Sequence, residues 1–355
     1  MKATFPRFGF DTPVLKRFFE DLGAAVVLPP ATTRRTLSLG VERSPELICM
    51  PFKITLGNFL EAQELGADTF FMAAGARKCR FGYYHFLQGQ ALARTGNGCR
   101  VVPVGQYSAY DFIFRLMPTE LGVTPAQVVR ALGLMFARSR LSEDFRRLLN
   151  RRRAVDFAGA ERLMPAGLAL VEGARTFTEV RRARAELRRL LAVNGRRPAL
   201  RIGLVGEIYF MIEQFANQDV EKELARLGVE VVFVRSLYRH LLHLLHLDRT
   251  FYRSRRLAHR YLRSCPGGEA IRTVGESVYF TESGRVDGIV HIYPFTCMPE
   301  NIALEALQQL SEDTGMPVLS LSFDEHTSRT GLLTRLEAFV DLVARRKRDR
   351  DLSRN

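Results

Sequence analysis

The sequence predicts an α/β protein with two Rossmann-like, doubly wound parallel-sheet domains and a helical insert between them. Short apolar runs alternate with amphipathic helical segments in residues 1–120 and again in residues 199–345. This alternation is typical of parallel sheets that are covered by helices on both faces. Residues 121–198 lack strand signals, and apolar residues make up 46% of the 355-residue chain. The chain therefore has enough apolar material for two packed cores.

Residues 1–120 form the first expected domain. Short apolar runs predict its strands at Lys2–Phe5, Ala24–Leu28, Leu47–Met50, Thr69–Ala73 and Arg100–Val104. Apolar residues at helical spacing predict its helices at Pro13–Leu22, Ile54–Leu65 and Arg80–Ala93. The connections between parallel strands are expected to be right-handed.

Residues 121–198 form the expected helical insert. The segments VTPAQVVRALGLMFARS and AGAERLMPAGLALVEGARTFTEVRRARAELRRLLAVNG both have apolar residues at helical spacing. Their many arginines predict a basic, solvated helix face. Gly195 and Pro198 are typical of a helix end, so they mark the boundary with the next domain.

Residues 199–345 form the second expected domain. Its strands are predicted at 199–206, 229–234, 287–295 and 317–323. Its helices are predicted at Glu213–Leu227, across Ser236–Arg263, and at Gly268–Thr281, Pro299–Asp313 and Gly331–Ala344. Residues 346–355 are expected to form a basic, frayed tail.

Three cysteines share one kind of sequence context. Cys49 and Cys297 each begin a Cys-Met-Pro sequence between an apolar run and an amphipathic helix, and Cys79 also precedes a helix. Proline suits the first helical turn, so the thiols of Cys49 and Cys297 are expected near unpaired N–H groups and the positive end of a helix dipole. Such surroundings lower a thiol pKa, and basic residues flank Cys79. We therefore predict one thiolate-lined site between the two domains, with small buried apolar residues as the alternative interpretation.

The spacing of the three cysteines fits neither a zinc ribbon nor a ferredoxin. Cysteines from separate loops can still hold one iron–sulfur cluster if the fold brings them together, and thiolates select iron–sulfur, zinc or copper(I). Cys99 precedes a strand, and Cys265 follows a helix in the sequence SCPGG. We do not expect either of them to be a ligand.

Other polar residues allow two interpretations each. Glu207, with Asn217 downstream, could line the cleft between domains or belong to a polar loop. The residues Asp324, Glu325 and His326 could face the cleft or cap the next helix. Three histidines recur every third residue and would drift around a helix, so they are expected at the edge of the core or on the surface; they are His240, His243 and His246.

Several function classes lack support in the sequence. The segment GLVGEIYF has no G-x-G-x-x-G fingerprint, and the chain has no Walker A motif and no nucleophile elbow. No apolar run is long enough for a transmembrane helix, and the N-terminus lacks the apolar core of a signal peptide. Five cysteines, an odd number, argue against a disulfide framework and indicate a reducing, cytoplasmic location.

The net charge of +14 comes with no recognised nucleic-acid motif, so a nucleic-acid partner is not expected. A basic surface can equally steer an acidic protein or the phosphates of coenzyme A.

Five segments of the chain resemble the superfamily of 2-hydroxyacyl-CoA dehydratase and benzoyl-CoA reductase subunits, and more narrowly its activase-related (CoA protein activase) branch. They are PELICMPFKITLGNFLEA, AAGARKCRFGYYHFLQ, IGLVGEIYFMIEQFANQDVEKELARLGVEVV, YPFTCMPENIALEAL and SFDEHTSRTGLLTRLEAFVDL. The resemblance implies paired Rossmann-like domains that hold a [4Fe–4S] cluster through Cys49, Cys79 and Cys297. It also implies a separate ATP-hydrolysing iron–sulfur activator that delivers low-potential electrons for reduction or radical dehydration of an acyl-CoA.

Three hypotheses follow for the function. In the first, the chain is a subunit of an iron–sulfur oxidoreductase or acyl-CoA dehydratase, working with a related second subunit or as a homodimer. In the second, it is a non-catalytic scaffold or partner subunit of an activator or dehydratase complex. In the third, it is a zinc-bound α/β protein. The dehydratases work as pairs of related subunits, and this chain shows no feature that marks an acyl-CoA pocket.

Overall fold

The computed structural model describes residues 1–75, 79–95, 99–105, 108–193 and 195–352. The chain divides into two compact units by its internal contacts. The first unit comprises Met1–Ser142 and Val171–Val180, and the second comprises Glu143–Leu170 and Arg181–Asn355. Within the described residues each unit contains one four-stranded parallel sheet with flanking helices, which confirms the predicted α/β fold.

The sheet of the first unit has the strand order β2-β1-β3-β4. Its strands are β1 (Lys2–Thr4), β2 (Ala25–Val26), β3 (Thr69–Ala73) and β4 (Arg100–Val104). Its larger helices are α1 (Thr12–Asp21), α2 (Arg34–Glu42), α3 (Met50–Glu64) and α4 (Tyr84–Ala93), and the 3-10 turn η2 (Arg80–Tyr83) leads into α4. After β4 the chain forms α5 (Ala109–Asp111), the π-helical turn η3 (Phe112–Leu116) and α6 (Met117–Leu121).

The predicted strand at Leu47–Met50 is wrong, and α2 was not predicted. Residues 46–48 form a turn and a bend, and α3 begins at Met50. Every residue of α3 from Met50 to Ala62 is buried. The sequence at the start of this helix therefore resembles that of a buried strand. Hydrophobic periodicity alone does not separate these two cases in a short run.

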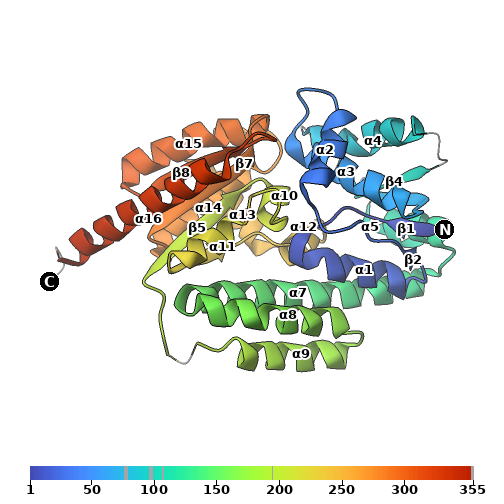
Figure 1. The fold of residues 1–355 in the computed structure, drawn as a ribbon, viewed down its shortest axis with the longest axis horizontal. Helices are drawn as coiled ribbons and strands as arrows, with labels where there is room; N and C mark the ends of the chain where they lie inside the picture. The colour runs from blue at the N-terminus through green and yellow to red at the C-terminus, as the bar shows by residue number, and fades with distance from the viewer. Residues whose placement is uncertain (76–78, 96–98, 106–107, 194, 353–355) are drawn as a thin grey trace. The chain divides into compact units, whose positions relative to one another are not determined.

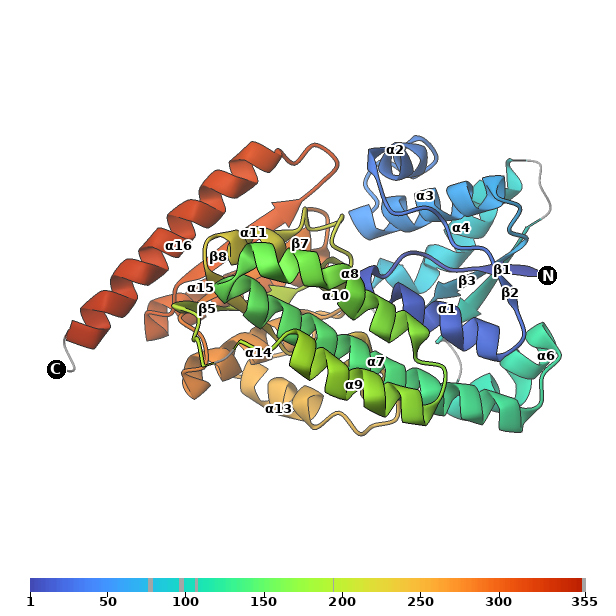
Figure 2. The same ribbon diagram turned by 60° about the horizontal axis from the view of Figure 1, so that its bottom comes forward.

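The helical segment comprises α7 (Pro125–Val155), α8 (Phe157–Gly173) and α9 (Phe177–Leu190), and its helical character is as predicted. The parts of these helices that belong to the second unit lie side by side (Figure 2). The expectation of a wholly solvated basic face is wrong, because Arg138, Arg146 and Arg153 are buried. Each of them pairs with a carboxylate, which is how a buried guanidinium is usually accommodated.

The sheet of the second unit has the strand order β6-β5-β7-β8, and Figure 1 labels three of these strands, β5, β7 and β8. Its strands are β5 (Leu200–Gly206), β6 (Val229–Phe233), β7 (Gly288–Pro294) and β8 (Val318–Phe323). Its helices beyond the helical segment are α10 (Ile208–Ile212), α11 (Val220–Arg226), α12 (Leu237–Leu244), α13 (Arg249–Ala258), α14 (Ala270–Ser283), α15 (Met298–Thr314) and α16 (Arg329–Leu352). Every residue of β7 is buried, so this strand lies at the centre of the core.

Two predictions in the second unit are corrected. The expected helix Glu213–Leu227 is only α11, because Gln218 and Asp219 have positive φ angles of 53° and 59° that interrupt a helix. Residues 346–352 of the expected frayed tail are instead the last part of α16, and residues 353–355 lie outside the described residues. No helix within the described residues has both the length and the apolar character needed to cross a membrane.

The two sheets share one topology. In chain order, both units arrange their strands as second, first, third and fourth. Cys79 and Cys297 both follow the third strand of their sheet, whereas Cys49 lies between the second and third strands. The repeated Cys-Met-Pro sequence therefore does not mark equivalent places in the two units.

Candidate functional site

The structure places all three candidate cysteines at the N-cap of a helix, as the sequence predicts. Cys49 precedes α3, Cys79 precedes η2, and Cys297 precedes α15. All three have extended backbone conformations, with φ of −68°, −132° and −80°. Backbone N–H groups at a helix start favour negative charge at such a position, so each thiol occupies a place that suits a thiolate.

In the first unit, side-chain contacts tie the start of α3 to the segment that begins at Cys79. Cys49 is 8% exposed, and its Sγ lies 2.5 Å from the hydroxyl oxygen of Tyr84, the first residue of α4. The guanidinium of Arg80 donates a hydrogen bond of 2.7 Å to the carbonyl oxygen of Leu47. The two helix starts that carry Cys49 and Cys79 are thus held together.

In the second unit, Cys297 follows the end of β7, beside β5 at the point where the strand order reverses. β5 ends at Gly206, and the backbone N–H of Glu207 donates a 3.0 Å hydrogen bond to Ile292 in β7. A Cβ at Gly206 would overlap the carbonyl oxygen of Ile292, and its φ is +143°, so this crossing requires glycine. Ligands of open α/β sheets bind at such a reversal point.

Buried polar side chains lie beneath this point. Glu300, in the first turn of α15, is fully buried, and its Oε1 accepts a hydrogen bond of 3.1 Å from Thr273 Oγ1. Its Oε2 lies 2.9 Å from Nε2 of His291, a buried residue of β7. The other ring nitrogen of His291, Nδ1, lies 3.2 Å from Ser320 Oγ in β8. A carboxylate, an imidazole and two hydroxyls therefore form one connected chain.

Arg235 extends this chain on the far side of Thr273. It is fully buried and donates hydrogen bonds to Glu276 (3.0 Å), to Thr273 (3.3 Å) and to the carbonyl oxygen of Gly206. Burial alone would lower the pKa of Arg235, but the carboxylates of Glu276, Glu269 and Glu300 together raise its pKa above the ordinary value. Arg235 is therefore the charged centre around which these carboxylates are arranged.

Glu207 is both a helix cap and an unusually weak acid. Its side chain accepts a 3.0 Å hydrogen bond from the N–H of Phe210 at the start of α10. Burial raises the pKa of Glu207 to about 7, backbone hydrogen bonds oppose this shift, and Glu300 and Glu269 add to it. The buried Asn217 donates to the carbonyl oxygen of Phe210 with a distance of 2.5 Å, so it supports the same turn.

The other polar residues that the sequence analysis considered lie at the edge of the core or stabilise a turn. His240 and His243 are partly buried and His246 is exposed, as expected. Asp324 accepts hydrogen bonds from the N–H of His326 (3.0 Å) and from Thr327 Oγ1 (2.8 Å), which organises the turn before α16. Across the part of the chain that the structure describes, no group of three or more His, Cys, Asp or Glu side chains is arranged to hold a metal ion.

Cys99 and Cys265 differ from the three candidates. Neither caps a helix at its start, since Cys99 precedes β4 and Cys265 lies between α13 and α14. Burial raises the pKa of Cys99, and Cys265 is exposed.

Sequence analysis missed Tyr84, which contacts Cys49, and the buried network that meets the first turn of α15. The network consists of Arg235, Thr273, His291 and Glu300. The available signal was a histidine inside the apolar strand GIVHIYP and a glutamate directly after Cys-Met-Pro. A polar side chain in an otherwise buried run needs a hydrogen-bond partner, and that requirement could have identified the pair of His291 and Glu300.

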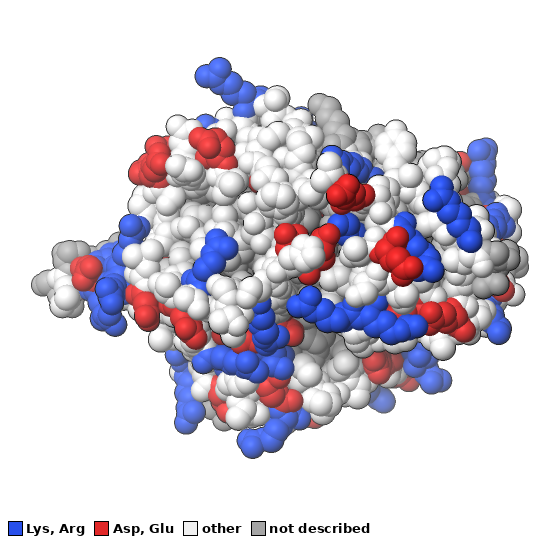
Figure 3. All heavy atoms as spheres, turned by 45° about the horizontal axis from the view of Figure 1, so that its top comes forward, with Lys and Arg blue, Asp and Glu red and all other residues white. Residues whose placement is uncertain are grey.

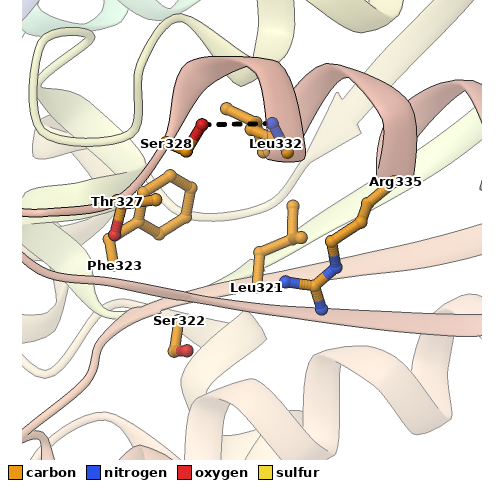
Figure 4. Close-up of a pocket in the computed structure, with 8 residues that line it drawn as sticks. Leu321, Ser322, Phe323, Thr327, Ser328, Leu332 and Arg335 are labelled. Carbon is orange, nitrogen blue, oxygen red and sulfur yellow. Dashed lines mark hydrogen bonds between the residues drawn. The ribbon is translucent and has the colours of Figure 1, made fainter.

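A separate shallow pocket of about 180 Å³ lies where β8 meets the start of α16 (Figure 4). Its buried floor consists of Leu321, Phe323 and Leu332. Arg335 lines one side and donates a 2.7 Å hydrogen bond to the carbonyl oxygen of Ser320.

The surface charges are mixed on the face shown in Figure 3, where Lys and Arg side chains are scattered among Asp and Glu side chains.

Comparisons with known proteins agree with the resemblance drawn from the sequence. A family model described as 2-hydroxyglutaryl-CoA dehydratase, D-component, matches residues 123–343, which is more than half of the chain. A second model, described as CoA enzyme activase uncharacterised domain, matches residues 8–74. The first match includes Cys297, the second includes Cys49, and Cys79 lies between them. No curated protein matches the chain.

Proposed function

Because the chain belongs to the 2-hydroxyglutaryl-CoA dehydratase D-component family, we propose that it is an iron–sulfur protein whose Cys49, Cys79 and Cys297 hold a [4Fe–4S] cluster. One observation carries this proposal: all three cysteines cap the start of a helix. Thiolates are the ligands of such clusters, and each N-cap position favours the thiolate form. The donor set therefore fits the cluster chemically.

The surroundings of the cysteines support a tuned redox site. The Tyr84 hydroxyl lies within hydrogen-bond distance of Cys49 Sγ, and hydrogen bonds to ligand sulfurs help to set cluster potentials. When bound, the cluster would supply one-electron chemistry. We propose that the chain takes low-potential electrons from an ATP-dependent iron–sulfur activator in the cytoplasm. The substrate would be an acyl-CoA that undergoes reduction or radical dehydration, and the assembly would include a related second subunit or a second copy.

Anaerobic purification and reconstitution, followed by iron and sulfide analysis, test the cluster. Cys49→Ala and Cys297→Ala are each expected to lose essentially all bound iron, because two thiolates cannot replace three. Cys99→Ala is the matched control, since Cys99 precedes the strand β4 and not a helix, and this variant should bind iron like the wild type. Wild-type protein without stoichiometric iron, or a Cys49→Ala variant with full iron content, would contradict the proposal.

A non-catalytic scaffold is the second candidate function. It is favoured by the match of residues 8–74 to the CoA enzyme activase domain, which suggests a place within an activator complex. Assays with reduced activator and a panel of acyl-CoA thioesters separate the two candidates. Turnover that depends on this chain excludes the scaffold, whereas a stable complex without turnover supports it.

A further inference from the structure

The first turn of α15 is held by a single buried carboxylate. Glu300 contacts Thr273 through one oxygen (3.1 Å) and His291 through the other (2.9 Å). Thr273 belongs to α14 and His291 to β7, so three elements meet at this side chain. All three residues are 0% exposed. The Glu300 carboxylate therefore joins the start of α15 directly to α14 and β7.

The backbone around Cys297 is fixed from both sides as well. The side-chain amide of Asn301 donates to the carbonyl oxygens of Cys297 (2.9 Å) and Phe295 (3.0 Å). Pro299 packs against Gly268, where an added Cβ would lie 2.9 Å from the proline Cγ. Three residues shortly after Cys297, namely Pro299, Glu300 and Asn301, therefore have defined contacts in the structure.

We propose that Glu300 is a positioning residue for Cys297, holding the N-cap of α15 so that the thiol keeps one orientation. This inference rests on the proposed function, in which Cys297 is a cluster ligand. The equivalent residue after the first Cys-Met-Pro is Phe52, which packs edge-on against Tyr84 with ring centroids 5.1 Å apart. The second unit uses a buried carboxylate where the first uses an apolar contact.

Titratable and charged groups from several elements lie around Glu300. His291 contacts it from β7, and Arg235, from the segment after β6, and Glu207, which follows β5, interact with it electrostatically. Glu269 and Glu276, at the start and in the body of α14, pair with Arg235. Removal of the Glu300 side chain leaves His291 and Thr273 buried without this partner, which favours local opening of the turn.

The test measures how fast iodoacetamide alkylates Cys297 in iron-free, folded protein, by mass spectrometry of its peptide. Glu300→Ala frees the first turn of α15, and the alkylation rate is expected to rise at least about fivefold. Glu300→Gln keeps an acceptor for Thr273 and should stay within about twofold of the wild type. Glu305→Ala removes an exposed carboxylate of the same helix and should leave the rate unchanged. The exposed Cys265 is the internal reference.

A second variant and a spectroscopic readout complete the test. If Glu300→Ala does not fold, Thr273→Val removes one of the two contacts and should raise the rate at Cys297 by about twofold or more. An unchanged Cys297 rate in a folded variant, or an equal rise at Cys265, overturns the inference. In reconstituted protein, Glu300→Ala should alter the electron paramagnetic resonance spectrum of the reduced cluster, and Glu300→Gln should restore it. Because alkylation uses iron-free protein, wild-type protein that binds no iron would contradict the proposed function alone.

Discussion

At the scale of single residues, the two Cys-Met-Pro sequences differ in the residue that follows proline. Phe52 is 1% exposed and contacts Tyr84, whose hydroxyl reaches Cys49. Glu300 is 0% exposed and contacts Thr273 and His291. The same local motif is therefore anchored by apolar packing in one unit and by hydrogen bonds in the other.

The raised pKa of Glu207 predicts a pH-dependent stability. Its pKa rises from 4.5 to about 7 on burial, so the folded state binds the proton more tightly than the unfolded state. This contribution to the free energy of unfolding is complete below pH 4.5 and is lost as the pH rises through about 7. Glu207→Gln keeps the cap on Phe210 but cannot ionise. Its stability relative to the wild type should therefore increase from about pH 5 to about pH 8 in urea denaturation.

Glu305→Gln is the control for this titration, because Glu305 is exposed. The Glu305→Gln measurement shows how much of any change comes from a glutamate-to-glutamine substitution as such. If the curves of wild type and Glu207→Gln run parallel over the whole range, the Glu207 carboxyl does not carry the assigned shift.

At the scale of elements, the shared strand order relates Cys79 to Cys297 and sets Cys49 apart. Cys79 and Cys297 lie on the connection from the third to the fourth strand, and Cys49 lies on the connection before the third strand. If one cluster binds all three, two ligands come from equivalent connections and one from a different connection. The sites of the two units are therefore related by topology but are not copies.

The contact between α2 and α3 predicts opposite effects for two glycine substitutions. A Cβ at Gly57 would overlap the carbonyl oxygen of Thr36, so Gly57→Ala should push the helices apart and destabilise the protein by roughly 3 kcal/mol or more. Gly89 in α4 has only ordinary contact, with Val101 at 3.7 Å. Gly89→Ala should therefore stabilise by up to about 1 kcal/mol, because alanine favours the helix. Thermal unfolding of both variants measures the difference, and equal effects would contradict it.

At the scale of the whole molecule, α7 contributes to both compact units. In the second unit, Arg146 is 6% exposed and pairs with Glu221, and its guanidinium lies 4.0 Å from the ring centroid of Phe233. Because Glu221 is buried as well, this ion pair removes one positive and one negative charge from the surface, and it does not change the net charge of +14.

This burial predicts unequal effects for two arginine substitutions. Arg146→Ala leaves Glu221 buried with its ion pair broken and should cost about 3–5 kcal/mol of stability. Arg182→Ala, at an exposed position of α9, should change the stability by no more than about 0.5 kcal/mol. Urea denaturation measures both. Similar small effects would show that the arginines of the helical segment all serve the surface.

The sequence by itself determined the alternating α/β architecture and the helix starts at the cysteines. It did so because hydrophobic periodicity acts locally, as does the proline in the first turn after Cys49 and after Cys297. β3 and β4 have the predicted bounds, since each is a short run of strand-forming residues between clear turn signals.

Only the tertiary structure decided which apolar run forms a strand and which polar side chains are buried in the core. Residues 47–50 form a turn and the start of α3, because a short apolar run fits the start of a buried helix as well as it fits a strand. Glu300, His291 and Arg235 became a connected network because residues distant in the chain meet beneath one helix start. Burial depends on neighbours from other elements, and that information is absent from any local pattern.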